Sequence, residues 1–314
     1  MKRSWDEDDN IADKVLYALI MMLGVLVRSI SRKHSTAVAY VIGDFLYNVL
    51  KMRRPLVENN LALTFPEKKN SEIKAIARQV YRHQAENFIE VLRLPMIKTA
   101  GDAARLIDID ALDFLAKTID RNKGVVLVSA HYGNWELMAH CIGLLMAPLT
   151  LVVRPLKNHA VDRQINRWRS MSGNRIVYDG QALREGLRAL KNREILVLLG
   201  DQSDPVGGFS TEFLGRSSSV FLGPAYLALK AGVPLFVGMS RRDGKGLYSV
   251  DFQEIDQTGL GTTKTDAEEL ARRYTKVLAR HIYQHPEEWF WLHNRWKLPW
   301  TRPFSKSKNG TTIS

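Results

Sequence analysis

The sequence contains little cysteine and no apolar run long enough for an ordinary membrane span, and each shortage excludes a class of protein. Its one cysteine, Cys141, cannot form a disulfide within the chain, which fits a reducing compartment. The apolar run at residues 15–27 has some thirteen residues, whereas a helix needs about 20 to cross a bilayer. Acidic residues precede this run and no small-residue cleavage site is evident, so the run is not typical of a secretory signal peptide.

Acidic residues are also in the minority. The chain has 33 Asp and Glu against 45 Lys and Arg, which gives a net charge of +12 and an isoelectric point near 9.7. This excess implies an anionic partner, which could be nucleic acid, an anionic membrane surface, or a phosphorylated or acidic substrate. The basic residues are dispersed and no nucleic-acid recognition motif is evident, so we expect no nucleic-acid partner.

The amino-terminal region has two apolar segments, at residues 15–27 and 37–50. Each is followed by basic residues, which are Arg28, Arg32 and Lys33 after the first and Lys51, Arg53 and Arg54 after the second. Apolar helices with trailing basic residues are typical of a segment that lies on an anionic membrane, and tilt and snorkelling could stretch the first into a marginal span. A helical hairpin packed on the rest of the protein is the alternative.

With 314 residues, the chain is long enough for one large domain with additions. We expect a membrane-associating helical segment at residues 1–60, a catalytic domain at 61–303 and a disordered polar tail at 304–314. Residues 71–118 are helical in pattern, except for a short connector or strand at 102–115.

From residue 124 onward, apolar runs alternate with amphipathic segments. Strands are predicted at 125–128, 149–153, around 176 and at 195–199, and helices at 134–146, 160–171 and 180–191. This rhythm predicts an α/β fold with a largely parallel, mixed sheet flanked by helices. Farther along, the pattern predicts a loop at 209–219, a hairpin of strands 234–239 and 247–252, and a helix at 263–281.

The stretch GVVLVSAHYGNWELM, residues 124–138, joins a buried strand to a helix start. It places His131 after the carboxyl end of the strand, where open α/β sheets bind ligands. Glu136 in the first helical turn would accept the Nδ1 proton of His131, leaving Nε2 as a general base for a substrate hydroxyl. Free backbone amides at Asn134 and Trp135 would stabilise an oxyanion. A hydrogen-bonded core histidine is the simpler alternative.

Polar residues also follow two other predicted strands, with Arg154 after 149–153 and Asp201 and Gln202 after 195–199. Because the ends of parallel strands share one edge of the sheet, His131, Arg154 and Asp201 are expected to converge. Arg154 suits a bidentate grip on phosphate, and a salt bridge that closes the loop is its alternative. Asp201 in isolation is compatible with a turn residue or a metal ligand.

These motifs resemble those of the bacterial lipid A biosynthesis lauroyl/myristoyl acyltransferases, within the lysophospholipid and glycerol-phosphate acyltransferase superfamily. HYGNWE at 131–136 is similar to the family's H-x4-[DE] block. The resemblance continues in the family's order over roughly residues 12 to 300, through NNLALTFPE at 59–67, Arg154 with Pro155 and Asn158, Arg169 with Gly173, Asp201 with Gln202, FLG at 213–215, GPA at 223–225, and PEEWFWLHNRW at 286–296.

The resemblance implies a glycerol-phosphate acyltransferase-like fold and a membrane-associated O-acyltransferase in lipid A, and hence lipopolysaccharide, biosynthesis. The implied location is the cytoplasmic face of the cell inner membrane. His131 and Glu136 would be the catalytic residues. The implied substrate-binding residues are Asn134, Arg154, Asn158, Arg169, Asp201 and Gln202.

The implied reaction transfers a fatty acyl chain from a thioester, expected on acyl carrier protein, to a hydroxyl of a phosphorylated glycolipid, a lipid A precursor. The basic surface suits both the acidic carrier protein and the phosphorylated acceptor. No metal or redox cofactor is implied. Acylation of another glycolipid or of a lysophospholipid from acyl-CoA is the first alternative. A metal-dependent hydrolase using His131, Glu136 and His140 is the second, although the H-E-x-x-H motif is absent.

Overall fold

The computed structural model describes residues 10–107, 112, 115–117, 123–204, 208–243 and 247–296. The expected disordered tail at 304–314 lies outside these residues, as does most of the turn expected between the strands of the late hairpin.

A six-stranded sheet forms the centre of the fold, with the strand order β3-β2-β4-β1-β7-β8. Its strands are β1 Val125–Ser129, β2 Leu149–Val153, β3 Arg175–Tyr178, β4 Ile195–Leu199, β7 Leu235–Arg242 and β8 Tyr248–Glu254. All neighbouring strands are parallel except β8, which runs antiparallel to β7. The predicted α/β fold with a largely parallel, mixed sheet is therefore confirmed.

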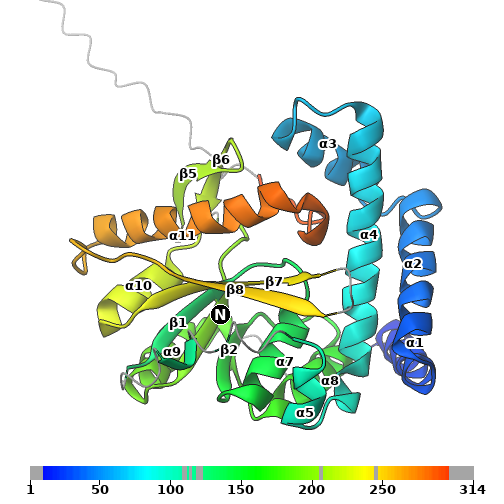
Figure 1. Cartoon of the computed structure of the whole chain (residues 1–314), viewed down its shortest axis with the longest axis horizontal. Helices are drawn as coiled ribbons and strands as arrows, with labels where there is room; N and C mark the ends of the chain where they lie inside the picture. The colour runs from blue at the N-terminus through cyan, green and yellow to red at the C-terminus, as the bar shows by residue number, and fades with distance from the viewer. Residues whose placement is uncertain are drawn as a thin grey trace, which may run out of the picture.

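Helices cover both faces of this sheet (Figure 1). One face packs against α5 Ala100–Ala104, α7 Trp135–Leu145 and α8 His159–Arg169, and the other against α9 Ala182–Lys191, α10 Gly223–Ala231 and α11 Lys264–Gln284. Successive strand residues point to opposite faces, so Leu127 belongs to the core beneath α7 and Val128 to the core beneath α10 and α11. Burial on both faces explains why β1 is apolar over its length up to Ser129.

The amino-terminal third is helical and stands at one side of the sheet (Figure 1). It comprises α1 Ile11–Ser29, α2 Arg32–Asn48, α3 Arg54–Thr64 and α4 Asn70–Arg93. Helix α4 joins the two cores, because Val80 packs in one and Ile89 in the other. Asp44 on α2 accepts paired hydrogen bonds from Arg78 and Arg82 on α4, which holds α2 against α4.

Helix α1 leaves an apolar stripe exposed. Its members are 48% to 81% exposed and are Ile11, Val15, Leu16, Leu19, Met22, Val25 and Leu26. Val41, Phe45 and Val49 form a second exposed row along α2 and its C-cap. Within the described ranges, no helix combines the length and apolar character needed to cross a membrane.

Two local predictions were wrong. The stretch 209–219, expected to be a loop, contains the antiparallel hairpin of β5 Phe209–Phe213 and β6 Arg216–Val220. Its glycine and serines suggested a loop, but Leu214 and Gly215 both have positive φ, as two-residue hairpin turns of type I′ require. The start of 102–115, expected to be a connector or strand, instead falls in helix α5, which Thr99 and Asp102 stabilise as a capping box.

Candidate active site

His131 and Asp201 meet because β1 and β4 are neighbouring parallel strands. The register pairs Ser129 with Leu199, and each polar residue lies two positions beyond its strand. The Nδ1 atom of His131 is 2.9 Å from Oδ1 of Asp201, and the backbone amide of His131 donates to Oδ2 at 3.1 Å. The predicted convergence of these two residues at the sheet edge is therefore confirmed.

The surroundings of Asp201 keep its carboxyl group ionised. The residue is 2% exposed, and this burial raises its pKa. The charge of His131 and the hydrogen bonds from His131 and from Nε1 of Trp289, at 2.8 Å, lower the pKa by more, to about 2. An ionised carboxylate only accepts hydrogen bonds, so Nδ1 of His131 carries a proton, and in the neutral imidazole Nε2 presents a lone pair. Nε2 of Gln202 lies 3.3 Å from Nε2 of His131 and can donate to its lone pair.

Glu136 does not take the position predicted for it. Its Oε2 and Oε1 accept hydrogen bonds from Nε and Nη2 of Arg169, at 2.9 and 2.5 Å. The reason is geometric, since the strand register gives the Nδ1 side of His131 to Asp201, whereas the first turn of α7 faces Arg169 at the end of α8. Burial raises the pKa of Glu136, but Arg169 lowers it by more, so the carboxylate is ionised. The predicted Glu136 to Nδ1 hydrogen bond is thus corrected to an Asp201 to Nδ1 hydrogen bond.

The turn that carries His131 is fixed by backbone contacts. The carbonyl of His131 accepts from the amide of Phe290 at 2.9 Å, and the amide of Gly133 donates to the carbonyl of Glu288 at 3.1 Å. Gly133 has φ +56°, and a Cβ atom there would lie 1.7 Å from the carbonyl oxygen of Ser240. Only glycine therefore fits this position.

Aromatic rings flank the imidazole of His131. Its centroid is 4.9 Å from that of Trp135 and 6.2 Å from that of Phe290. The His131 side chain keeps 21% of its surface exposed, whereas the Asp201 side chain keeps 3%. The imidazole of His131 is thus accessible to solvent, whereas its hydrogen-bonding partner Asp201 is buried.

Two asparagines predicted to contact substrate are helix caps. Oδ1 of Asn134 accepts from the amide of Leu137 at the start of α7, and Oδ1 of Asn158 accepts from the amide of Val161 at the start of α8. Nδ2 of Asn158 donates to the carbonyl of Asp13 at 2.9 Å, which ties α8 to α1. The two residues are 1% and 9% exposed. The structure therefore places both as helix caps, and their contact with substrate stays a prediction.

Arg154 lies apart from His131. It follows β2, and β4 separates β2 from β1 in the sheet. Its Nε is 3.0 Å from Oδ2 of Asp179, and the two side chains are 80% and 46% exposed. The expected convergence of Arg154 with His131 is therefore corrected to an exposed salt bridge, which was its alternative interpretation.

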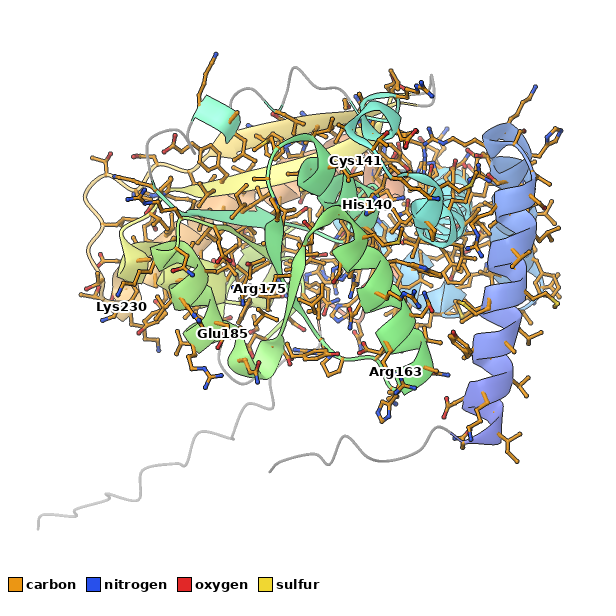
Figure 2. The ribbon with its side chains drawn as sticks, turned by 90° about the horizontal axis from the view of Figure 1, so that it is seen from below. His140, Cys141, Arg163, Arg175, Glu185 and Lys230 are labelled. Atoms are coloured by element: carbon orange, nitrogen blue, oxygen red, sulfur yellow. The ribbon has the colours of Figure 1, made fainter. Side chains whose placement is uncertain are left out.

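The geometry does not favour a metal ion held by His131, Glu136 and His140. His140 is 1% exposed, and its Nε2 lies 2.9 Å from the carbonyl oxygen of Ile97. Figure 2 shows His140 beside Cys141 on α7, and Cys141 is also buried. No group of three or more His, Cys, Asp and Glu side chains with metal-binding geometry occurs in the part of the chain that the structure describes.

An apolar slot opens between α7 and the sheet, next to the active-site turn. It has a volume of about 50 Å³. Its lining residues include Ser129, Trp135 and Glu136 at one end and, deeper in the core, Leu127, Met138, Ile142, Leu151 and Val197. His131 does not line the slot itself, but the ring of Trp135, which does, contacts the imidazole of His131.

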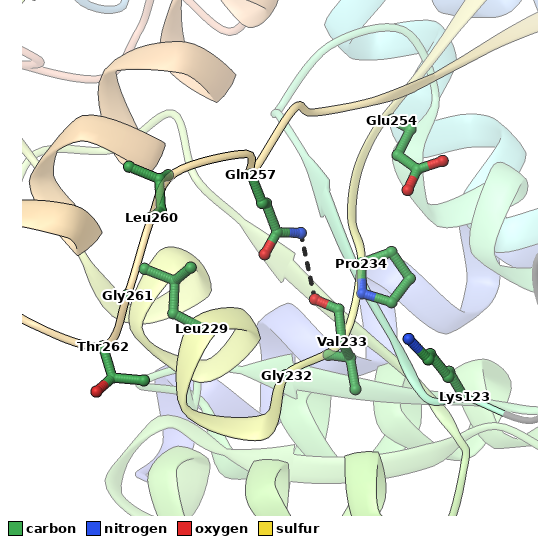
Figure 3. Close-up of a pocket in the computed structure, with 10 residues that line it drawn as sticks. All are labelled: Lys123, Leu229, Gly232, Val233, Pro234, Glu254, Gln257, Leu260, Gly261 and Thr262. Atoms are coloured by element: carbon green, nitrogen blue, oxygen red, sulfur yellow. Dashed lines mark hydrogen bonds between the residues drawn. The ribbon is translucent and has the colours of Figure 1, made fainter.

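A larger hollow of about 340 Å³ lies at the opposite edge of the sheet (Figure 3). Lys123, just before β1, and Pro234, just before β7, line it. It therefore lies where these parallel strands begin, whereas His131 lies beyond the end of β1. This hollow contributes nothing to the His131 site.

Trp289 is the site residue that the sequence did not single out. The structure buries Trp289 to 1% and uses its indole N–H to hold Asp201. The only sequence signal for Trp289 was its place in the family-like run at 286–296. Nothing in its spacing indicated Asp201 as its partner.

Comparison with known proteins identifies the family of this chain. The profile of the family described as bacterial lipid A biosynthesis acyltransferase matches residues 10–298. The lipid A biosynthesis lauroyltransferase of Escherichia coli (strain K12) is 26% identical over 266 residues, covering 83% of this chain and 84% of that protein. The palmitoleoyltransferase of the same organism is 26% identical over 269 residues, with 85% of each chain covered.

A phosphatidylinositol mannoside acyltransferase of Mycolicibacterium smegmatis is also similar. It is 26% identical over 211 residues, which cover 66% of this chain and 67% of that protein. All three relatives are named as acyltransferases that act in lipid metabolism, which implies an acyl donor and a lipid acceptor for this chain. Because the family profile extends over nearly the whole sequence, the chain belongs to the bacterial lipid A biosynthesis acyltransferase family.

Proposed function

We propose that this acyltransferase uses His131 as the general base that activates a hydroxyl of its lipid acceptor, with Asp201 holding the imidazole. The observation that carries the proposal is the contact between Nδ1 of His131 and the ionised, buried Asp201. It leaves Nε2 as the proton acceptor of the neutral ring. The arrangement supplies the base and orienting acid of a hydrolase triad, and the substrate hydroxyl replaces the serine.

The proposed reaction balances without a cofactor. The acceptor oxygen attacks the thioester carbonyl carbon while its proton passes to Nε2 of His131. The tetrahedral intermediate then breaks its C–S bond, and the departing thiolate receives the proton from the imidazolium. The backbone amides of Trp135 and Glu136 precede the first hydrogen bond within α7 and follow closely after His131, so they are suited to stabilising the oxyanion.

Gln202 and Glu136 have supporting roles in this proposal. Gln202 donates to Nε2 in the absence of substrate, and the acceptor hydroxyl takes its place. The ionised Glu136 holds Arg169 in the slot wall next to Trp135. Glu136 therefore still supports activity in this proposal. It does so by holding Arg169 in place and by supplying a negative charge near His131.

The apolar slot supports a fatty acyl chain as the transferred group. Leu127, Ile142 and Val197 offer only hydrocarbon contacts to an occupant. At about 50 Å³, the slot accommodates only part of an alkyl chain unless its lining side chains move. Burial of each methylene group contributes about 0.8 kcal/mol, so the slot favours long acyl donors over acetyl groups.

The donor that we propose is acyl carrier protein, and the acceptor is a phosphorylated glycolipid of the lipid A type. The net charge of +12 complements both an acidic carrier and a lipid phosphate. The names of the Escherichia coli relatives support lipid A, whereas the Mycolicibacterium relative supports another glycolipid. Acyl-CoA with that second acceptor is accordingly the alternative that the experiment must separate.

We also propose that the protein lies on the cytoplasmic face of the cell inner membrane. The exposed apolar stripe of α1 and the apolar row on α2 supply the contact. Basic residues such as Lys33 and Lys51 lie near the ends of these helices and attract anionic lipid, at about 1 kcal/mol each. Binding at the membrane surface fits helices that are too short or too polar to span the bilayer.

The test is mass spectrometry of lipids after incubation of the purified protein with candidate acceptors. Dodecanoyl acyl carrier protein and dodecanoyl-CoA are compared as donors. The wild type should add one acyl group to a lipid A precursor, His131→Ala should add none, and His34→Ala should match the wild type. Near-normal transfer by folded His131→Ala would overturn the mechanism, and exclusive acylation of a phosphatidylinositol mannoside would overturn the acceptor.

A further inference from the structure

Helix α4 buries two carboxylates that the proposed mechanism does not use. Glu86 and Glu90 are 4% and 6% exposed. Arg242 of β7 lies between them, 3.0 Å from Glu86 and 2.9 Å from Glu90, and Arg32 of α2 contacts Glu90 at 2.7 Å. Buried ion pairs seldom add more stability than well-packed apolar residues would, so this cluster calls for another explanation.

Glu90 reaches the active-site turn directly. Its Oε2 accepts a hydrogen bond from Nδ2 of Asn134 at 2.7 Å, as well as bonds from Arg242 and Tyr248. Burial raises the pKa of Glu90, but Arg242 and Arg32 lower it by more, so Glu90 stays ionised and acts only as an acceptor.

A second contact comes from the same helix. Nδ2 of Asn87 donates to the carbonyl of Gly133 at 2.6 Å. Together with the Glu288 carbonyl, which accepts from the Gly133 amide, these contacts grip Gly133 and Asn134 from two sides. The residues between His131 and α7 are therefore held by α4 and by the segment that carries Trp289.

Asn134 links these contacts from α4 to the residues around His131. Its Oδ1 caps α7 by accepting from Leu137, and its Nδ2 is held by Glu90. A shift of Asn134 would therefore move the first turn of α7, which carries Trp135 and Glu136, relative to His131. Displacing reacting groups by about 1 Å can lower a rate by about a hundredfold.

We infer that Glu90 is a positioning residue for acyl transfer, which acts through Asn134 to hold the first turn of α7 in register with His131. The inference rests on the proposed function, because it assigns Glu90 a part in the same reaction. Arg242 and Arg32 serve this role by neutralising the carboxylate, and Arg32 extends the network to α2.

The test uses substitutions that keep the helix cap. Asn134→Ser retains a capping oxygen but loses the donor to Glu90, and Asn134→Asp also sets a second carboxylate against Glu90. We expect kcat for transfer from dodecanoyl acyl carrier protein to fall about tenfold in Asn134→Ser and about a hundredfold in Asn134→Asp. KM for the donor should stay within about twofold, since neither residue binds it.

A reciprocal exchange distinguishes positioning from a general loss of stability. In Glu90→Gln/Asn134→Asp, the glutamine amide donates to the new aspartate, so kcat should recover at least about tenfold over Asn134→Asp alone. The matched control is Thr150→Val, which removes a buried hydroxyl's bond to Glu194 at the opposite edge of the sheet. Its kcat should stay within about twofold of the wild type.

Hydrogen–deuterium exchange of amides 131–137 adds a readout that needs no activity. Exchange should quicken in Asn134→Ser and stay unchanged in Thr150→Val. The inference is overturned if Asn134→Ser keeps the wild-type kcat, if the double variant shows no recovery, or if losses merely follow the unfolded fraction. Activity in His131→Ala would instead overturn the proposed function, whose failure is thereby distinguishable.

Discussion

Asp201 determines which nitrogen of His131 carries the proton, because its ionised carboxylate accepts from Nδ1. In the proposed mechanism, the other nitrogen, Nε2, therefore meets the substrate. The side chain of Asp201 is itself buried and is not accessible to substrate. In the proposed reaction, Asp201 orients the imidazole and stabilises the imidazolium that forms during transfer. A residue of this kind affects the rate of the chemical step more than substrate binding.

Asp201→Asn tests this assignment. An asparagine amide facing Nδ1 favours the wrong tautomer, so kcat should fall by about 10³- to 10⁴-fold, with little change in KM. Steady-state kinetics with the acyl thioester measures both constants. Asp256→Asn, which alters an exposed aspartate in the loop after β8, is the control and should retain full activity. A loss of less than about tenfold in Asp201→Asn would contradict the role.

Glu136 has a different partner, and its substitution should affect stability as well as activity. Glu136→Gln leaves the guanidinium of Arg169 largely buried without its anion, which should cost about 3 to 5 kcal/mol in the free energy of unfolding. Glu136→Gln/Arg169→Met removes both charges and should regain most of that loss. Urea denaturation measures the difference, and equal instability of the single and double variants would argue against the pair.

At the scale of elements, the tight approach of the His131 turn to β7 leaves no room for a side chain. Gly133→Ala would place Cβ 1.7 Å from the Ser240 carbonyl oxygen, at a positive φ. We expect a loss of at least about 2 kcal/mol in unfolding free energy. Gly180→Ala is the control, because nothing lies within 4 Å of its added carbon. Urea denaturation of both variants should show a change near zero for Gly180→Ala only.

The contact between α2 and α4 should be sensitive to acid. Hydrogen bonds from Arg78 and Arg82 hold the pKa of Asp44 well below its usual range. A carboxyl group whose folded pKa is depressed stabilises the protein above its unfolded pKa, near 4, and loses that contribution as the pH falls toward the folded pKa.

Asp44→Asn should therefore lower stability at pH 7 and flatten the decline below about pH 4. Thermal unfolding between pH 2 and 7 is the measurement. Asp102→Asn is a comparison, since Asp102 lies in the capping box of α5, away from α2 and α4. An unchanged acid profile in Asp44→Asn would show that other carboxyl groups govern the loss.

Prediction succeeded best where one element carries its own signal. The β1, β2 and β4 strands and the helices between them follow from apolar runs and amphipathic spacing, and the structure confirms them. The hairpin at 209–220 was missed because its serines and glycine resemble a loop, whereas its strands are set by pairing between Phe213 and Arg216 and by the turn between them. Local composition does not reveal such pairing.

For the whole molecule, the apolar stripe on α1 is the feature that the proposed membrane contact depends on. Met22→Glu/Val25→Glu places two charges on residues that are 66% and 62% exposed. Sedimentation with vesicles of anionic phospholipid should show at least about tenfold weaker binding, and added salt should weaken the wild type as well. Leu183→Glu, at a 54% exposed position on α9, should bind like the wild type. Unaltered vesicle binding by the α1 variant would place the contact elsewhere.

The sequence by itself determined the alternation of strands and helices, the position of His131 beyond a buried strand and the resemblance to an acyltransferase family, because these are encoded in short contiguous patterns. Only the tertiary structure decided the partner of His131. The strand order puts β4, and not β2, beside β1, so the parallel register delivers Asp201 to Nδ1 and leaves Arg154 one strand away. Glu136 is five residues from His131 in sequence, yet the direction of α7 turns it toward Arg169. Strand order and helix direction depend on packing over the whole core, which no local pattern records.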